Sequence, residues 1–437
     1  MSPESCKIEH MFEELAMVDP ASEESALVER IAELERVKSA AAAGQARAAA
    51  ALDAVRRSAE AAAGIPAARR CRGVASEIAL ARRDSPARGS RHLGFAKALV
   101  HEMPHTLAAL ESGVLSEWRA TLIVRESACL DVEDRRTLDA ELCGQPADLV
   151  GLGDARVAAA AKAIAYRLDP HAVVERAAKA ANERTVSIRP APDTMTYLTA
   201  LLPVAQGVSV YAALRGAADT TFDGRSRGQI MADTLIERVT GRSAATPTPI
   251  AVNLVLSDQT LLGGDNTAAD VCGYGPIPAE VARGLVVGAV TARSRATLRR
   301  LYAHPRSGAL VAMESRSRLF PRGLAAFIGL RDQSCRTPYC DAPIRHRDHA
   351  TPSRRAGRTS AQNGLGLCER CNYAKEAAGW QVSTSVDQKS THTAEFTTPT
   401  GARYRSGAPP VARAPTGIEV SELEVAVSIR LSDLHAA

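Results

Sequence analysis

Apolar residues recur at three- and four-residue spacing from about residue 23 to residue 180, in a segment rich in Ala, Leu, Glu and Arg. This spacing places apolar side chains on one face of an α-helix, and these residue types favour helix, so the pattern predicts a succession of helices. The alanine-rich part, 39–63, has too few large apolar residues for a coiled-coil seam. We expect a packed or semi-exposed pair of ordinary helices there.

Two helix starts can be placed by their capping residues. Ser116 is a suitable N-cap for a helix that begins at Glu117, and Asp169 followed by Pro170 starts a helix that continues to about residue 183. The segment 104–124 has the spacing of a DNA-reading helix-turn-helix, but any two packed helices joined by a glycine turn produce the same pattern. Two packed helices without a DNA-reading role are therefore the preferred interpretation.

The middle of the chain mixes both periodicities. Short strands are predicted at 185–189, 194–201 and 249–256, and helices at 204–218, 227–240 and 279–290. Asp219, Asp223 and Asp233 could bind a cation, but a solvated turn followed by a capped helix explains them better. The segment Gly273–Pro278 lacks the donors of a phosphate loop, and a rigid turn is expected.

The end of the chain changes character again. Three short strands, 379–385, 392–398 and 402–405, are predicted to form an antiparallel meander, with a turn at Pro399-Thr-Gly401. A linker at 408–415 follows. Apolar residues alternate over 421–431, which favours a strand, although Ser421 could also begin a helix.

Composition narrows the class of protein. The chain has 437 residues, of which 46% are apolar, with neither a long uncharged apolar run nor a secretory signal at residues 1–10. No membrane span or membrane partner is expected. Five of the nine cysteines are scattered and expected to be reduced, whereas four lie within 37 residues. These features favour a cytoplasmic protein whose clustered cysteines bind metal.

Charge points to a polyanion as partner. Residues 291–380 contain 17 Lys and Arg against 6 Asp and Glu, although the whole chain has a net charge of only +5. A solvated basic face would be the simpler explanation of an isolated charge run. Because this run surrounds a candidate metal site, nucleic acid is the better hypothesis.

The clustered cysteines have the spacing of a structural zinc site. Cys335 and Cys340 form one pair, and Cys368 and Cys371 form the other, so two tight turns can supply four thiolates to a tetrahedral Zn²⁺. Four unrelated buried cysteines are the alternative. A zinc ion would replace the hydrophobic core that so short a segment cannot build.

Between the cysteine pairs, 344–349 and 364–368 are predicted as paired strands and 371–378 as a short helix, which makes a ββα unit. Asp348 and Asn372 offer hard oxygen ligands suited to Mg²⁺ or Mn²⁺. His349, on the other face of the strand, could act as general base on a water molecule. A structural histidine is the alternative.

These residues resemble the HNH endonuclease motif of the ββα-metal (His-Me finger) superfamily. The resemblance implies that Asp348 and Asn372 bind the catalytic metal, that His349 activates water, and that Asn363 pins the connecting loop. It covers about 50 residues. The order of a helical region, a mixed region, the segment Phe327–Cys335 with the HNH motif, and then Gly379-Trp380 and Thr398–Tyr404 is similar to actinobacterial repeat-family proteins that join an N-terminal domain of unknown function to a C-terminal HNH domain. This wider resemblance covers most of the chain.

The fold class implied is α+β and multidomain: a mainly helical N-terminal region with a few short strands, then a small zinc-stabilised ββα-metal HNH domain. The expected division is a helical region at 1–183, a mixed continuation at 184–326, the HNH domain at 327–380, and a meander and tail at 381–437.

The connecting loop departs from the commonest HNH pattern. Many relatives have Gly-Gly there, and histidines where Cys371 and Asn372 stand, whereas this loop is basic. Simple solvation of its arginines is equally compatible with the sequence. Six side chains are candidate contacts to nucleic-acid phosphates: Arg345, Arg347, Arg354, Arg355, Arg358 and Lys375.

The predicted function is metal-dependent hydrolysis of phosphodiester bonds, with DNA favoured as substrate. The alternative is a zinc-stabilised DNA-binding protein without catalysis. An interaction protein whose helical region assembles partners is compatible with either.

Overall fold

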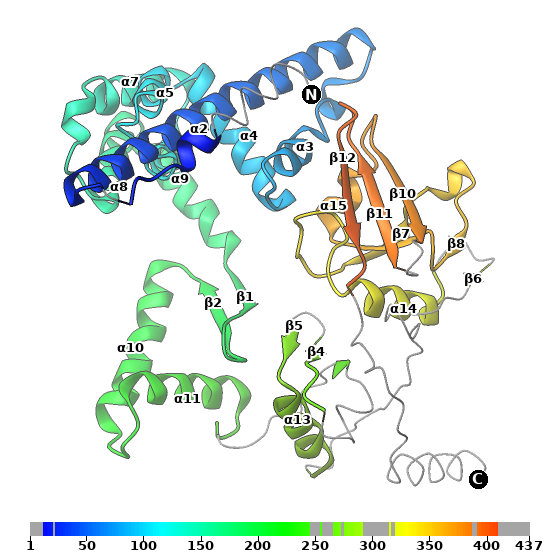
Figure 1. The fold of residues 1–437 in the computed structure, drawn as a ribbon. Coiled ribbons are helices and arrows are strands. Elements are labelled where there is room, and N and C mark those ends of the chain that lie inside the picture. Colours follow the sequence, from blue (N-terminus) through cyan, green and yellow to red (C-terminus); the bar gives the residue numbers. More distant parts are fainter. Residues whose placement is uncertain are drawn as a thin grey trace, which may run out of the picture. The chain divides into compact units, whose positions relative to one another are not determined.

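The structure of the chain is a computed structural model that describes residues 12–20, 22–244, 254–255, 265–271, 275–291, 314–315, 320–386 and 391–409. Two compact units, Met1–Lys179 and Ala180–Ala437, divide it. The elements are labelled in Figure 1.

The first unit is helical, as the apolar spacing predicts. Its helices are α2 (Glu24–Ala62), α3 (Val74–Ala81), α4 (Pro86–His101), α5 (Pro104–Glu111), α6 (Glu117–Glu126), α7 (Val132–Cys143), α8 (Asp154–Leu168) and α9 (Pro170–Ala180). The side chain of Ser116 accepts a hydrogen bond from the backbone N–H of Arg119, and Asp169 Oδ1 accepts one from the N–H of Ala172 at 2.8 Å. Both predicted caps are therefore confirmed.

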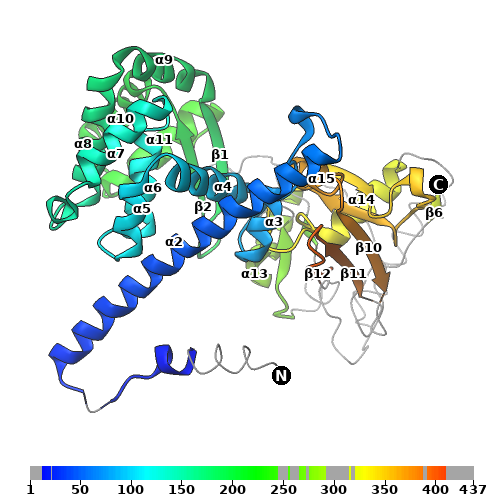
Figure 2. The ribbon, with the colours of Figure 1, turned by 90° about the horizontal axis from the view of Figure 1, so that it is seen from above.

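The predicted helix pair at 39–63 is wrong, because α2 is a single helix of 39 residues, drawn unbroken in Figure 2. Ala42, Ala43, Ala46, Ala49 and Ala50 are buried along one face and belong to the hydrophobic core of this unit. Alanine has the highest helix propensity, and small side chains let neighbouring helices approach closely. A stripe of alanines is therefore enough to pack this long helix against the core of its unit.

The second unit begins with a hairpin and two helices. β1 (Thr185–Pro190) pairs antiparallel with β2 (Thr196–Leu201), and α10 (Val204–Thr220) and α11 (Arg227–Thr240) follow. Ser226 caps α11 through a capping box with Gln229. All four predicted elements are present.

The three aspartates near this cap are paired with arginines. Arg225 bonds to both Asp223 and Asp233, and Arg227 pairs with Asp219. The carboxylates thus have cationic partners within the chain, which agrees with the solvated-turn interpretation rather than with a cation site.

Residues 254–291 contain β3 (Leu254–Val255), β4 (Ala269–Val271), β5 (Gly275–Ile277) and α13 (Ala279–Thr291). The rigid turn predicted at Gly273–Pro278 is in part wrong, because Gly275–Ile277 pairs antiparallel with β4. Pro276 lacks an N–H, but it is tolerated here because β5 lies at the edge of its small sheet. Most of the strand predicted at 249–256, and the alternating segment 421–431, lie outside the described residues.

The C-terminal part is built from short antiparallel strands around α14 (Arg322–Asp332) and α15 (Glu369–Ala374). β6 (Glu314–Ser315) pairs with β8 (Thr359–Ser360), and β7 (His346–His349) pairs with β9 (Gly364–Leu367). β10 (Gln381–Val386), β11 (His392–Thr397) and β12 (Arg403–Gly407) form the predicted meander. We call residues 320–386 and 391–409 the C-terminal module.

The meander shares one core with the cysteines. Val382, Ala394 and Phe396 pack in the same buried cluster as Leu365 and Leu367, together with Cys335, Cys340 and Cys371. Because Phe396 is only 1% exposed, the meander closes the core of the ββα unit.

Helix α14 is joined to the same core by a buried ion-pair network. Asp332 receives hydrogen bonds from the N–H of Gly366 at 2.7 Å and from Arg336 at 2.9 Å. Arg331 donates to the carbonyl of Gly364 at 2.7 Å. Charges buried this deeply are stabilised only when their hydrogen bonds are satisfied, so the network fixes the end of α14 on β9.

A glycine makes this approach possible. A Cβ atom on Gly364 would lie 2.4 Å from Ile328 of α14, which is far inside contact distance. A side chain there would displace the tips of Ile328 and Phe320, which lie against this position of β9, the strand that leads into Cys368.

Candidate functional site

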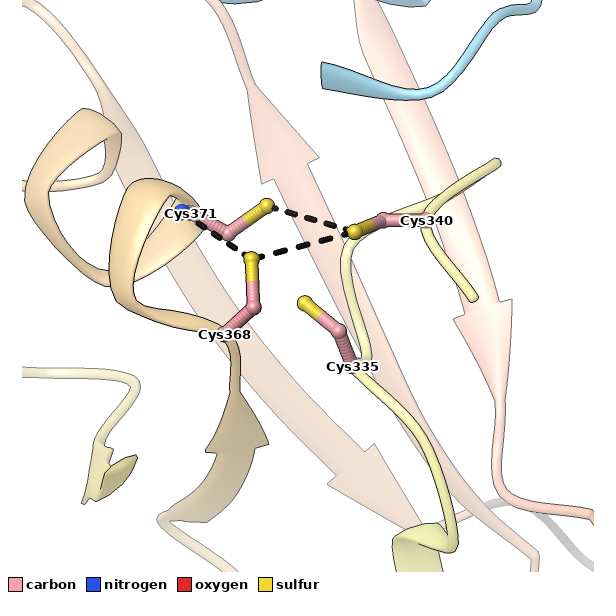
Figure 3. Close-up of side chains that lie close together, drawn as sticks. All are labelled: Cys335, Cys340, Cys368 and Cys371. Atoms are coloured by element: carbon pink, nitrogen blue, oxygen red, sulfur yellow. Dashed lines mark hydrogen bonds between the residues drawn. The ribbon is translucent and has the colours of Figure 1, made fainter. Parts of the chain in front are cut away.

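The four clustered cysteines converge on one point, as Figure 3 shows. Their sulfur atoms all lie within 4.8 Å of one another. Cys340 Sγ is 3.7 Å from Cys371 Sγ and 3.9 Å from Cys368 Sγ. Four sulfurs at the usual Zn–S distance of about 2.3 Å would be about 3.8 Å apart in a regular tetrahedron. The spacing of the thiols therefore fits a zinc ion, and the predicted pairing of two cysteine turns is confirmed as a cluster that could hold one.

Two tight turns aim these thiols. Cys340 donates its N–H to the carbonyl of Thr337 at 3.0 Å, with Pro338 second in the turn and Tyr339 in the left-handed region at φ 61°. Cys368 is the N-cap of α15, and its sulfur accepts the N–H of Cys371 at 3.4 Å. The backbone thus presents two sulfurs from each side.

Hydrogen bonds among the four thiols shift the pKa values of Cys368 and Cys371 in opposite directions. Hydrogen bonds from Cys335, Cys340 and Cys371 lower the pKa of Cys368, and the N–H of Cys371 lowers it further. The same sharing raises the pKa of Cys371, and its burial adds to the rise. Four thiolates this close repel one another, so a cation is needed to keep them all ionised.

Asp348 and His349 point to opposite faces of β7. The Asp348 side chain is 36% exposed, whereas the His349 side chain is 8% exposed. His349 Nδ1 lies 3.5 Å from Asp348 Oδ1, which accepts the backbone N–H of His349 at 2.8 Å. Alternation of side chains along a strand produces this arrangement, which the sequence predicts.

The buried imidazole of His349 is oriented by two neighbours. Its Nε2 lies 2.9 Å from Thr359 Oγ1 on β8, and its ring packs on Phe320 with centroids 4.7 Å apart. The ring is therefore held in one orientation, with Nδ1 on the side of Asp348.

A buried lysine pairs with the carboxylate of Asp348. Lys375 Nζ is 3.0 Å from Asp348 Oδ2 and 2.6 Å from Glu376 Oε1, with only 2% of its side chain exposed. Burial raises the pKa of Asp348, but the charge of Lys375 and the N–H of His349 outweigh it and hold that pKa below its ordinary value. Lys375, expected to contact nucleic acid, is instead enclosed by these two carboxylates.

Asn372 lies on α15, which packs against β7. Its Oδ1 is buried and has no hydrogen-bond partner in the described part of the chain. An unpaired buried carbonyl oxygen is costly, and Mg²⁺ and Mn²⁺ take such oxygens as ligands. The amide oxygen of Asn372 and the half-exposed carboxylate of Asp348 are oxygens of the kind that such a cation takes.

Asn363 closes the loop that connects β7 to β9. Its Oδ1 accepts the N–H of Thr351 at 2.9 Å, and its Nδ2 donates to the carbonyls of Thr351 at 3.0 Å and Arg358 at 2.9 Å. A Cβ atom on Gly357 would lie 1.7 Å from the Thr351 carbonyl, so only glycine fits beside this clip. The loop-pinning role implied for Asn363 agrees with these contacts.

The five candidate phosphate contacts other than Lys375 are exposed: Arg345, Arg347, Arg354, Arg355 and Arg358. Arg345 and Arg347 are at alternate positions in and before β7, and the guanidinium of Arg347 lies close to Gly329 of α14. Arg354 pairs with Glu376 at 2.5 Å. Their exposure suits contact with a polyanion and equally suits solvation.

Several neighbours of the site could not be identified from the sequence. Thr359 and Phe320 lie 10 and 29 positions from His349, and nothing in their residue types marks them. Glu376 directly follows Lys375 and looks like an ordinary surface charge. Thr359 lies on β8, Phe320 packs with residues of α14, and Glu376 follows α15, so only the tertiary structure brings these side chains to the dyad.

Comparison with known proteins assigns the larger part of the chain. Residues 31–332 match the family described as a domain of unknown function (DUF222). The chain belongs to this family, which confirms the N-terminal domain of unknown function that the resemblance implied. The match ends at Asp332, the last residue of α14. No curated protein and no solved structure matches the chain significantly.

The helices and the scattered cysteines bear on two expectations drawn from composition, the absence of a membrane span and the reduced state of the cysteines. None of the helices in the described residues is long and apolar enough to cross a membrane. Cys71, Cys129 and Cys143 are free thiols, whereas Cys6 and Cys272 lie outside the described residues.

Proposed function

We propose that the C-terminal module is an HNH endonuclease that hydrolyses phosphodiester bonds in DNA with a divalent cation. One relationship supports this proposal most directly. The half-exposed carboxylate of Asp348 lies beside the oriented ring of His349, and the carbonyl oxygen of Asn372 is buried without a partner. A general base and two hard ligands are the parts that this chemistry needs.

His349 has one nitrogen for orientation and one for proton transfer. If Nε2 donates its proton to Thr359 Oγ1, Nδ1 keeps its lone pair on the side of Asp348. Nδ1 can then take a proton from a water molecule that attacks phosphorus. Phe320 holds the ring and excludes solvent from one of its faces.

Asp348 and Asn372 would hold Mg²⁺ or Mn²⁺, which when bound stabilises negative charge on the phosphate and on the leaving oxygen. The Cys335, Cys340, Cys368 and Cys371 thiols would hold Zn²⁺ and keep α15 against β7. The zinc is structural in this proposal, because all four of its positions are filled by protein.

The test is cleavage of supercoiled plasmid DNA by the full chain with Mg²⁺ or Mn²⁺. His349→Ala should abolish cleavage and keep its zinc. His101→Ala is the control, because His101 is an exposed histidine of the N-terminal unit. Cleavage by His349→Ala at the wild-type rate would refute the assignment.

One observation favours the second candidate, a zinc-stabilised DNA-binding protein without catalysis. Lys375 already neutralises Asp348 and would compete with a divalent cation for that carboxylate. Salt-sensitive DNA binding with no strand breaks in either metal would support this candidate over the nuclease.

A further inference from the structure

A cavity of about 410 Å³ lies next to the Asp348–Lys375 pair. Its walls come from three segments: the basic loop after His349, the residues that follow α15, and the meander. Ala350, which directly follows His349, and Lys375, which pairs with Asp348, both line it, so the cavity adjoins the proposed catalytic residues. Its volume is within the range of ligand-binding sites.

Cations outnumber carboxylates around this cavity. Arg354, Arg355, Lys375 and Arg403 line it, against Glu376 and Glu395. Arg354 and Lys375 share Glu376, and Arg403 Nη1 lies 3.8 Å from Glu395. Arg355 has no ion pair within the described residues. The lining therefore has unneutralised positive charge, which favours an anionic ligand.

Trp380 is a buried residue of the lining. This residue lines the cavity and is only 5% exposed, and its indole Nε1 has no hydrogen-bond partner in the described part of the chain. An indole N–H is a donor only, and leaving it unpaired when buried is costly. Because the N–H is itself enclosed, a ligand in the cavity would reach it only if the indole turned.

We propose that this cavity binds a phosphodiester group of the DNA strand beside the bond that is cut, with Arg403 and Arg355 as its cationic contacts. The inference rests on the proposed function and extends it. It gives the meander a role, because Arg403 lies on β12, outside the ββα unit that carries the dyad. A DNA strand held in the cavity would lie close to Asp348, because Lys375 both lines the cavity and pairs with that carboxylate.

The chain contains a closely matched control for Arg403. Arg403 and Arg405 lie on the same strand, have side chains 69% and 71% exposed, and both pair with Glu395. Only Arg403 lines the cavity. The two variants therefore remove the same charge at nearly the same place and differ in contact with the cavity.

Binding of a short fluorescent DNA duplex would be followed by anisotropy at several salt concentrations, in the full chain with His349→Ala to prevent cleavage. Arg403→Ala should weaken binding several-fold and lower the slope of log affinity against log salt by about 0.9, the loss of one phosphate contact. Arg405→Ala should change neither.

Equal losses in Arg403→Ala and Arg405→Ala would overturn the inference, because any exposed arginine would then serve. Absence of DNA binding would also overturn it. The nuclease proposal is judged separately by plasmid cleavage in the wild type. A selective Arg403 effect without cleavage would leave DNA binding at the cavity standing and would remove the nuclease.

Discussion

Lys375 buries its ammonium group 3.0 Å from the carboxylate of Asp348. The lysine is one turn along the chain from Asn372, the other proposed ligand of the divalent cation. An ammonium ion and a metal ion are attracted to the same carboxylate oxygen and exclude each other there. The ion pair therefore lowers the affinity of the proposed site for a metal ion.

Lys375→Met should strengthen binding of Mn²⁺ several-fold, because Met fills a similar volume without the competing charge. Mn²⁺ binding can be followed by electron paramagnetic resonance, with zinc content measured in parallel. Asp348→Asn should abolish the Mn²⁺ signal change. Weaker Mn²⁺ binding in Lys375→Met would show instead that the lysine orders Asp348 for the metal.

Cys371→Ser should release zinc and unfold the C-terminal module. Structural zinc contributes roughly 10 kcal/mol or more of folding free energy in small domains, and here the cysteines share a core with the meander. Zinc content by mass spectrometry and amide exchange in β7 and β9 would report the change. Cys129→Ser, a free thiol of the N-terminal unit, should leave both unchanged. Full zinc retention in Cys371→Ser would exclude the four-cysteine site.

Asn363→Ala should open the connecting loop without unfolding the chain. It removes three side-chain hydrogen bonds to Thr351 and Arg358, worth about 2 to 4 kcal/mol together. Trypsin should then cut after Arg354, Arg355 or Arg358 about tenfold faster or more, because local opening precedes cleavage. Gln362→Ala, an exposed neighbour, should keep the wild-type rate, and no change in Asn363→Ala would contradict the clip.

His392 should make the C-terminal module sensitive to acid. Burial, and then the charge of Arg331, lower its pKa from 6.5 to about 4. A depressed histidine pKa means that the unfolded chain binds more protons between these values, so stability falls as pH drops through 6.5 and the loss is complete below about 4. The shift corresponds to about 3 kcal/mol.

Urea unfolding of wild type and His392→Gln between pH 7 and pH 4 would test this. The difference between the two stabilities should grow in favour of the variant as pH falls, whereas acid release of zinc affects both alike. Both proteins would carry Trp118→Phe. Because the chain has two tryptophans, the fluorescence then comes from Trp380 alone and reports unfolding of the C-terminal module. A pH-independent difference would show that His392 is not buried as described.

The sequence by itself determined the elements whose signals are local. Helix propensity and caps such as Ser116 placed the N-terminal helices, and cysteine spacing placed the four-cysteine cluster, because tight turns put paired thiols side by side whatever surrounds them. Alternation along a strand also separated the faces of Asp348 and His349. The signal for α2 was misleading only because prolonged alanine content does not reveal where a helix ends.

Tertiary structure decided the surroundings of the dyad. Thr359 and Phe320 reach His349, and Lys375 turns inward to Asp348, through packing of β8, α14 and α15 on one small core. No short-range pattern encodes these contacts, because each depends on which distant segments exclude water from the same place. The cavity beside Arg403 has the same origin: its three walls are far apart in the chain and meet only when the meander closes the core.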